Sequence, residues 1–232
     1  MKHCIRATAT VFAALLLAPL APSLTAQSHY PGMAPLAQYM MPSPAAEIAL
    51  ARSAAPASIS GAAEIMVLGR DGYTAVAKGS NGFLCLVERS WGAATTDPGF
   101  WNPKNRSPIC FNPAAARSVV PSYLLKTKLV LAGKSKAEIV HGLAAAFDSG
   151  KLPALELGAM CYMLSPHQAI GPDAELWHPH LMFFVHQPDA AWGANLPGSP
   201  VIASPDPEER YTIFMVLVGK WSDGTPAPPL NR

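Results

Sequence analysis

The sequence predicts an α+β fold built on a mainly antiparallel β-sheet. Three short apolar segments come first and are separated by glycine turns: 64–68, 73–78 and 83–89. Three later apolar segments are bounded by proline or glycine: 158–165, 178–186 and 211–220. Two segments with helical character lie between these groups: 122–132 and 136–149. We therefore expect a β-meander and three later strands, covered by a helical pair and joined by long loops rich in proline and glycine.

Residues 1–26 are predicted to be an export signal. Lys2 and Arg6 precede the apolar residues 7–20, and small residues lead up to Ala26. The apolar run is too short, and is broken too soon by proline, to span a membrane, which takes about 20 apolar residues. An uncleaved anchor is the alternative. We expect cleavage near Ala26, a periplasmic or secreted protein, and no transmembrane segment after cleavage.

The charge of the mature chain argues against a nucleic-acid partner. The whole chain has 17 Lys and Arg and 15 Asp and Glu, and the signal carries two of the basic residues and no acidic one. Nucleic-acid binding depends on clustered Lys and Arg, which a formally neutral chain does not predict. A small molecule or a metal ion is the partner that we expect.

The mature chain is predicted to start with a flexible lead-in, 27–43, followed by a single α+β domain, 44–232. The lead-in has scattered proline and no periodicity. Ser43 suits an N-cap and Pro44 suits the first helical position, so a short helix is expected over 45–54. In the meander that follows, the Asp-Gly and Asn-Gly pairs at 71–72 and 81–82 supply the positive φ angles of hairpin turns.

The long loop predicted at 91–113 is linked to the question of disulfides. It is rich in proline, glycine and asparagine, and it either serves the function or covers a sheet edge. Export would permit disulfides among Cys85, Cys110 and Cys161. We expect Cys85 to pair with Cys110, because the bond would tie this loop to a strand and stabilise the fold by roughly 3 to 4 kcal/mol. Three reduced thiols are the alternative, and Cys161 is left over either way.

The helix predicted at 136–149 has the stronger signals of the two. Ser135 and Glu138 fit a capping box, and apolar residues recur at helical spacing. The earlier segment, 122–132, includes Leu129-Val130-Leu131, which is equally compatible with a strand.

Three segments of the chain resemble a group of exported bacterial proteins to which no activity is assigned. The segments are Asn-Gly-Phe-Leu-Cys-Leu-Val-Glu-Arg at 81–89, Gly-Ala-Met-Cys-Tyr-Met-Leu-Ser at 158–165, and Trp-His-Pro-His-Leu-Met-Phe-Phe at 177–184. The resemblance implies an exported bacterial protein and transfers no catalytic residue.

The strand predicted at 178–186 carries the candidate site. His178, His180 and Met182 alternate onto one face of this strand, and Cys161 on the earlier strand offers a softer ligand. This mixture of imidazole, thioether and thiolate favours copper or zinc as the cofactor. A structural role, in which the imidazoles satisfy buried backbone groups, is the alternative.

Two other function classes compete with a metal site. A hydrolase-type enzyme would use His178 or His180 as general base, with Cys161, Ser165 or Glu88 as nucleophile or partner, but the sequence has no catalytic motif that fixes these residues in space. A binding protein would line a small-molecule cleft with loop aromatics: Trp91, Phe100, Trp101, Trp177 and Trp192. We interpret the chain as a non-catalytic periplasmic or secreted binding protein with a site centred on histidine, and whether it is an enzyme stays open.

Overall fold

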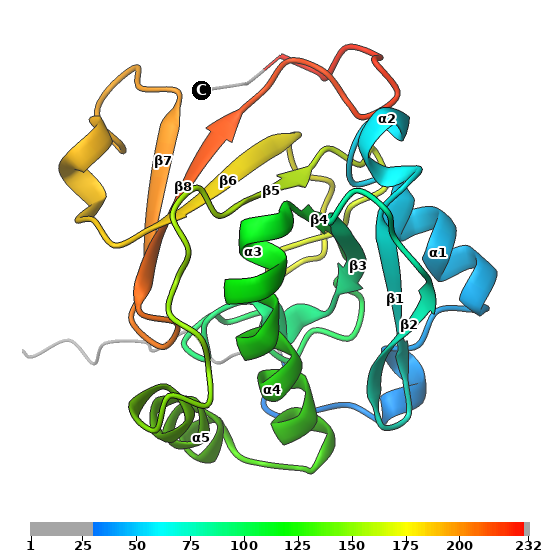
Figure 1. Cartoon of the computed structure of the whole chain (residues 1–232), viewed down its shortest axis with the longest axis vertical. Coiled ribbons are helices and arrows are strands. Elements are labelled where there is room, and N and C mark those ends of the chain that lie inside the picture. The colour runs from blue at the N-terminus through cyan, green and yellow to red at the C-terminus, as the bar shows by residue number, and fades with distance from the viewer. Residues whose placement is uncertain (1–29, 230–232) are drawn as a thin grey trace, which may run out of the picture.

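The computed structural model describes residues 30–229 and contains one eight-stranded sheet with helices beside it (Figure 1). The α-helices are α1 Pro44–Arg52, α2 Ala57–Ser60, α3 Pro113–Ser118, α4 Val120–Leu131 and α5 Lys136–Asp148. The strands are β1 Glu64–Gly69, β2 Gly72–Ala77, β3 Leu84–Glu88, β4 Ser107–Phe111, β5 Met160–Met163, β6 His180–Val185, β7 Val201–Asp206 and β8 Tyr211–Leu217. Short 3₁₀ helices are η1 Leu36–Gln38, η2 Ser90–Gly92 and η3 Asp189–Trp192.

The strand order is β2-β1-β3-β4-β5-β6-β8-β7. All neighbours are antiparallel except β1 and β3, which run parallel. The predicted α+β class with a mainly antiparallel sheet is therefore confirmed.

The prediction of a simple β-meander is wrong. Of the three strands predicted to form it, only β1 and β2 make a hairpin, and β3 lies on the other side of β1. The connection between β2 and β3 crosses the start of β1, where Ser80 N donates to Ala62 O at 2.8 Å and Glu64 N donates to Phe83 O at 2.8 Å. A Cβ atom on Gly79 would lie 2.3 Å from Glu64 N, so this close crossing requires glycine.

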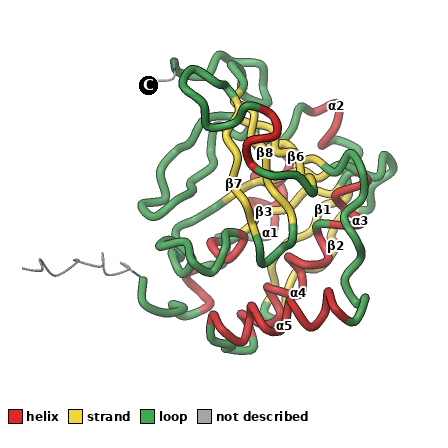
Figure 2. The backbone as a smooth tube through the Cα atoms, turned by 90° about the vertical axis from the view of Figure 1, so that its left-hand side faces the viewer, coloured by secondary structure: helices red, strands yellow, loops and turns green. Residues whose placement is uncertain are grey.

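Helices lie on both faces of the sheet, which differs from the expected cover by one helical pair. α1 packs on one face, where its Ala51 and the following Ala54 and Ala55 form a cluster with Ile65, Cys85, Val87 and Cys110. The alternate residues of the same strands pack with α3, α4 and α5 in a larger core. Figure 2 shows α4 and α5 side by side at one end of the molecule. Because both faces are covered, β3 is apolar on both sides, as its sequence indicated.

The predicted helices form, with small shifts at their ends. Ser43 Oγ accepts a hydrogen bond from Ala46 N at the start of α1, and Ser135 with Glu138 forms the capping box of α5. The segment 122–132 is helical, as α4.

Four α-helices or strands in described regions were not predicted: α2, α3, β4 and β7. β4 lies inside the segment 91–113 that was predicted to be a loop, because its proline and short length hide the strand pattern. From residue 30 onward, the predicted flexible lead-in packs against the domain instead. Tyr39 is completely buried there, and its hydroxyl donates to Trp101 O at 2.8 Å. Residues 27–29 and the predicted signal, residues 1–26, lie outside the described residues.

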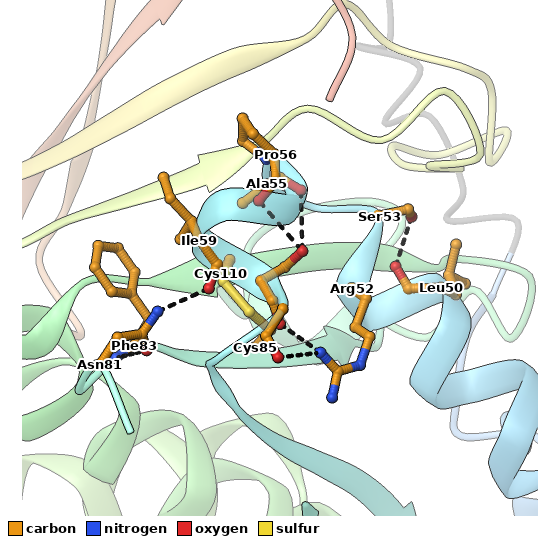
Figure 3. The surroundings of a disulfide bond; sticks show 12 residues. Leu50, Arg52, Ser53, Ala55, Pro56, Ile59, Asn81, Phe83, Cys85 and Cys110 are labelled. Atoms are coloured by element: carbon orange, nitrogen blue, oxygen red, sulfur yellow. Dashed lines mark hydrogen bonds between the residues drawn. A yellow bond between two sulfur atoms is a disulfide. The ribbon is translucent and has the colours of Figure 1, made fainter. Parts of the chain in front are cut away.

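The predicted disulfide between Cys85 and Cys110 is confirmed (Figure 3). The two residues face each other in register on β3 and β4, so the bond joins adjacent strands and not a strand and a loop. Cys161 is a buried free thiol. Within residues 30–229, no helix is long and apolar enough to cross a membrane.

A buried ion pair joins the segments around the end of β3. Arg89 donates to the carboxylate of Glu47 on α1 at 2.8 Å, and both side chains are almost fully buried. Arg89 also donates to the carbonyl oxygens of Tyr39 and Val87, and Glu47 accepts from Leu68 N on β1. The charged atoms therefore have several hydrogen-bonding partners, which a buried ion pair needs in order to offset desolvation.

Removing one member of this pair should destabilise the protein strongly. We expect Arg89→Met to lower the free energy of unfolding by about 3 to 5 kcal/mol, because it leaves the Glu47 carboxylate buried and uncompensated. The double variant Arg89→Met with Glu47→Leu should cost less than Arg89→Met alone. Urea unfolding at neutral pH measures both.

The exposed pair between Arg117 and Glu156 provides the control, since these side chains are 63% and 40% exposed. Arg117→Met should cost less than about 1 kcal/mol. Equal losses for Arg89→Met and Arg117→Met would contradict the role given to the buried pair.

Candidate functional site

The candidate site is a cavity of about 510 Å³ on the sheet face that also carries α3, α4 and α5. Its floor consists of side chains from β3, β4, β5, β6 and β8: Glu88, Ser107, Met163, His180, Met182, Ile213 and Met215. The loops 89–106 and 164–179 supply the remaining walls, which include Ile170, Leu176 and Trp177. The cavity is thus built on a rigid sheet and bordered by two loops.

Strand register explains why methionines gather in the floor. Met182 on β6 lies directly opposite Met215 on β8, and His180 lies opposite Met163 on β5. Residues opposite each other in register point to the same face, so these side chains converge. Methionine is flexible and polarizable, and such a floor adapts to apolar ligands of irregular shape.

The polar end of the cavity lies where β3 runs into η2. Glu88 and Ser90 are two residues apart there, and Asn105 precedes β4, the strand paired with β3. Ser90 is 3% exposed and Asn105 is 6% exposed, and among the described residues neither Ser90 Oγ nor Asn105 Oδ1 has a hydrogen-bonding partner. Buried polar atoms without a partner are rare in folded proteins, and a bound water, ion or ligand is one way to satisfy them.

Glu88 is the acidic group at this end. Burial raises the pKa of its carboxyl to about 8, against a lowering by Lys126 and with a small further rise from Glu209. A Cβ atom on Gly92 would lie 2.7 Å from Glu88 Oε2, so a glycine leaves the space that the carboxyl occupies. Glu88 is largely enclosed by protein but lines the cavity. Its carboxyl can therefore exchange a proton with a bound molecule.

Lys126 and its acidic partners hold a wall loop beside this end. Lys126 Nζ lies 3.0 Å from Glu209 Oε1 and 3.8 Å from Glu208 Oε2. Glu208 in turn accepts hydrogen bonds from the backbone and the hydroxyl of Thr95, at 2.9 and 2.6 Å. Lys126 is therefore engaged by Glu208 and Glu209 and is not a free cation for the cavity.

His180 is a neutral acceptor in the cavity wall. Its Nδ1 lies 2.8 Å from the carbonyl oxygen of His178, which can only accept, so Nδ1 carries the hydrogen and Nε2 is left unprotonated. Burial lowers the pKa of His180 to about 4, although the hydrogen bond to His178 opposes this shift. The Trp177 ring packs edge-on against the imidazole, with centroids 4.5 Å apart.

The structure brings together two of the four predicted ligands. His180 and Met182 line the cavity, whereas His178 precedes β6 and lines a separate hollow next to Leu196. Cys161 lies opposite Met182 in register but beneath the cavity surface, and burial raises the pKa of its thiol well above the ordinary value. No group of three or more His, Cys, Asp or Glu side chains between residues 30 and 229 is arranged to hold a metal ion. Binding of copper or zinc by these four residues stays a prediction.

The aromatic cleft expected from the sequence does not form, since Trp177 alone of the five loop aromatics lines the cavity. Trp91 and Phe100 are completely buried in the core, and Trp101 is 7% exposed. Trp91 donates from Nε1 to Thr127 Oγ1 at 2.9 Å, which satisfies its polar atom inside the core. Trp192 packs on Phe214, away from the cavity.

No binding role was predicted for Ser90 and Asn105 from the sequence, and Glu88 was predicted only as a nucleophile or partner in a hydrolase-type enzyme. One signal pointed to Glu88: it follows Leu84 and Leu86 on an otherwise apolar face of its strand.

No protein-family model matches the chain, and no curated protein or solved structure matches it either.

The low pKa of His180 makes stability depend on pH. In the unfolded chain the imidazole takes up a proton below about pH 6.5, whereas in the folded protein it does so only near pH 4. Wild-type stability should therefore fall, relative to His180→Gln, as the pH drops from about 6.5 to about 4, by up to about 3 kcal/mol.

Urea unfolding of both proteins across this pH range provides the measurement. His141→Gln, at an exposed position of α5, is the control and should keep the wild-type pH dependence. If His180→Gln and His141→Gln gave the same curve, His180 would not be a buried neutral histidine.

Proposed function

We propose that the protein is an exported, non-catalytic binding protein whose cavity binds a small and largely apolar organic molecule. The observation that carries this proposal is the combination of a methionine floor with unpartnered oxygens of Ser90 and Asn105 at one end. Ligand sites are typically concave and apolar, with a few polar groups that orient the ligand, and they have volumes of roughly 300 to 1,000 Å³. The cavity of about 510 Å³ lies in this range.

The disulfide supports the exported location. Disulfides persist in oxidising compartments and are rare in the cytosol, so the bond between Cys85 and Cys110 agrees with the signal predicted at residues 1–26.

The geometry favours binding over hydrolysis by a histidine base. At neutral pH His180 is unprotonated, but a pKa of about 4 makes it a weak base, and its Nδ1 is committed to a backbone carbonyl. Neither Ser90 nor Ser107 in the wall has a hydrogen bond to His180 within the described residues, so neither hydroxyl is activated as a nucleophile. His178 lines a different hollow.

Titration with the fluorescent apolar probe N-phenyl-1-naphthylamine tests the proposal. We expect saturable binding at one site per chain. The fluorescence of the probe should increase on binding, because the methionine floor shields the bound probe from water. Met182→Trp should weaken binding at least fivefold, since the larger ring occupies the floor.

Met160→Trp is the matched control. Met160 is also partly buried, but it lies on β5 with the opposite orientation, so it does not line the cavity. This variant should bind the probe within twofold of wild type. No saturable binding by the wild type, or equal binding by Met182→Trp, would overturn the proposal, and thermal unfolding checks that all three proteins are folded.

A further inference from the structure

We infer that the cavity selects organic cations, namely molecules with an apolar body and one protonated amine, and that Glu88, Ser90 and Asn105 receive the amine. This inference rests on the proposed function, because it names the class of ligand for the same cavity. Its basis is the charge of the cavity wall and the unpartnered oxygens of Ser90 and Asn105.

The wall carries acids without a free base. Glu88, Asp97, Asp173 and Glu175 all line the cavity, and Arg89 is the one Lys or Arg among its lining residues. The Arg89 side chain is completely buried and donates to Glu47 and to two backbone carbonyls. An anionic ligand would therefore meet carboxyl groups with no free cation beside them, whereas a cation can pair with one of them.

The atoms that lack partners complement a donor group. Ser90 Oγ and Asn105 Oδ1 are buried acceptors without a hydrogen bond in the described part of the chain. An ammonium group has three donors and no acceptor, which complements these two oxygens and the Glu88 carboxylate.

The strand pairing places Glu88, Ser90 and Asn105 together at one end of the cavity. Glu88 and Ser107 are opposite each other in the pairing of β3 with β4, and Ser90 and Asn105 continue the two chains beyond that point. Met182, Met215 and Ile213 lie on β6 and β8, further along the floor. A ligand with a single amine and an apolar body matches this division.

Binding of an ammonium ion should release a proton from Glu88. The carboxyl has a raised pKa of about 8, so at neutral pH it is mostly protonated before binding. The ligand cation would then pair with the carboxylate, and the carboxyl proton would leave to solvent. Affinity for the amine should therefore rise as the pH increases from 6 to 8.

The groups that act electrostatically on Glu88 do not change their charge between pH 6 and 8. The pH dependence of amine affinity therefore comes from Glu88 itself. Lys126 on α4 and Glu209 near β8 are paired with each other. Cys161 and three tyrosines are also coupled to Glu88, and burial raises the pKa of each, so all of them stay neutral up to pH 8: Tyr73, Tyr123 and Tyr211. His180 stays unprotonated above about pH 5 because its pKa is about 4.

Three probes with one apolar body test the inference: 1-naphthylmethylamine, 1-naphthylmethanol and 1-naphthylacetate. Each competes with N-phenyl-1-naphthylamine for the wild-type protein at pH 8. We expect the amine to bind at least tenfold more tightly than the alcohol, and the acetate to bind most weakly. Glu88→Gln should remove most of the preference for the amine over the alcohol.

Glu156→Gln, on the exposed Arg117 pair, is the control and should keep the wild-type preference. Equal wild-type affinities for the amine and the alcohol, or a preference for the acetate, would overturn the inference while probe binding upheld the proposed function. Failure of the naphthylamine probe itself to bind would instead overturn the proposed function. The wild-type comparison decides the inference even if Glu88→Gln does not fold.

Discussion

The buried ion pair between Arg89 and Glu47 is the interaction on which the arrangement of this fold depends. It joins α1 to the end of β3, and its hydrogen bonds extend to Tyr39 and to Leu68 on β1. Nearby, Tyr123 on α4 accepts a hydrogen bond from Arg89 N. Helices on the two faces of the sheet are thus fixed to one point of the chain. Because each partner would be costly to bury alone, the pair favours one packing of these segments over others.

The position of Arg89 also determines where the cavity forms. Arg89 points into the protein, while Glu88 and Ser90 on either side of it line the cavity. Its guanidinium is used entirely for structure, so the cavity wall gains no free positive charge from it. The same short segment therefore anchors the fold and supplies the acidic end of the site. Arg89 and Lys126 are paired with other carboxylates, so neither forms an ion pair with Glu88. Burial therefore raises the pKa of Glu88.

Local patterns in the sequence predicted local features well and long-range ones poorly. The capping box at Ser135 and the Ser43 cap depend on neighbouring residues, and both form as expected. The order of the strands depends on which strand β3 pairs with. The Asn-Gly turn at 81–82 is compatible with a hairpin to β2 and also with a connection that crosses β1. For the site, His180 and Met182 were identified because they alternate on one strand. Ser90 and Asn105 were not, because β4 was hidden in a proline-rich segment and their proximity depends on its pairing with β3.

The central claim is that the methionine floor and the acidic end form one site for an organic cation. Methyl NMR of protein labelled at its methionines tests this claim most directly, because an aromatic ring shifts the signals of the methyl groups that it contacts. On addition of 1-naphthylmethylamine, we expect the signals of Met163, Met182 and Met215 to shift in a saturable way, and that of Met160 to stay in place. Shifts confined to Met160, or no saturable shift of the three floor methionines, would contradict the account.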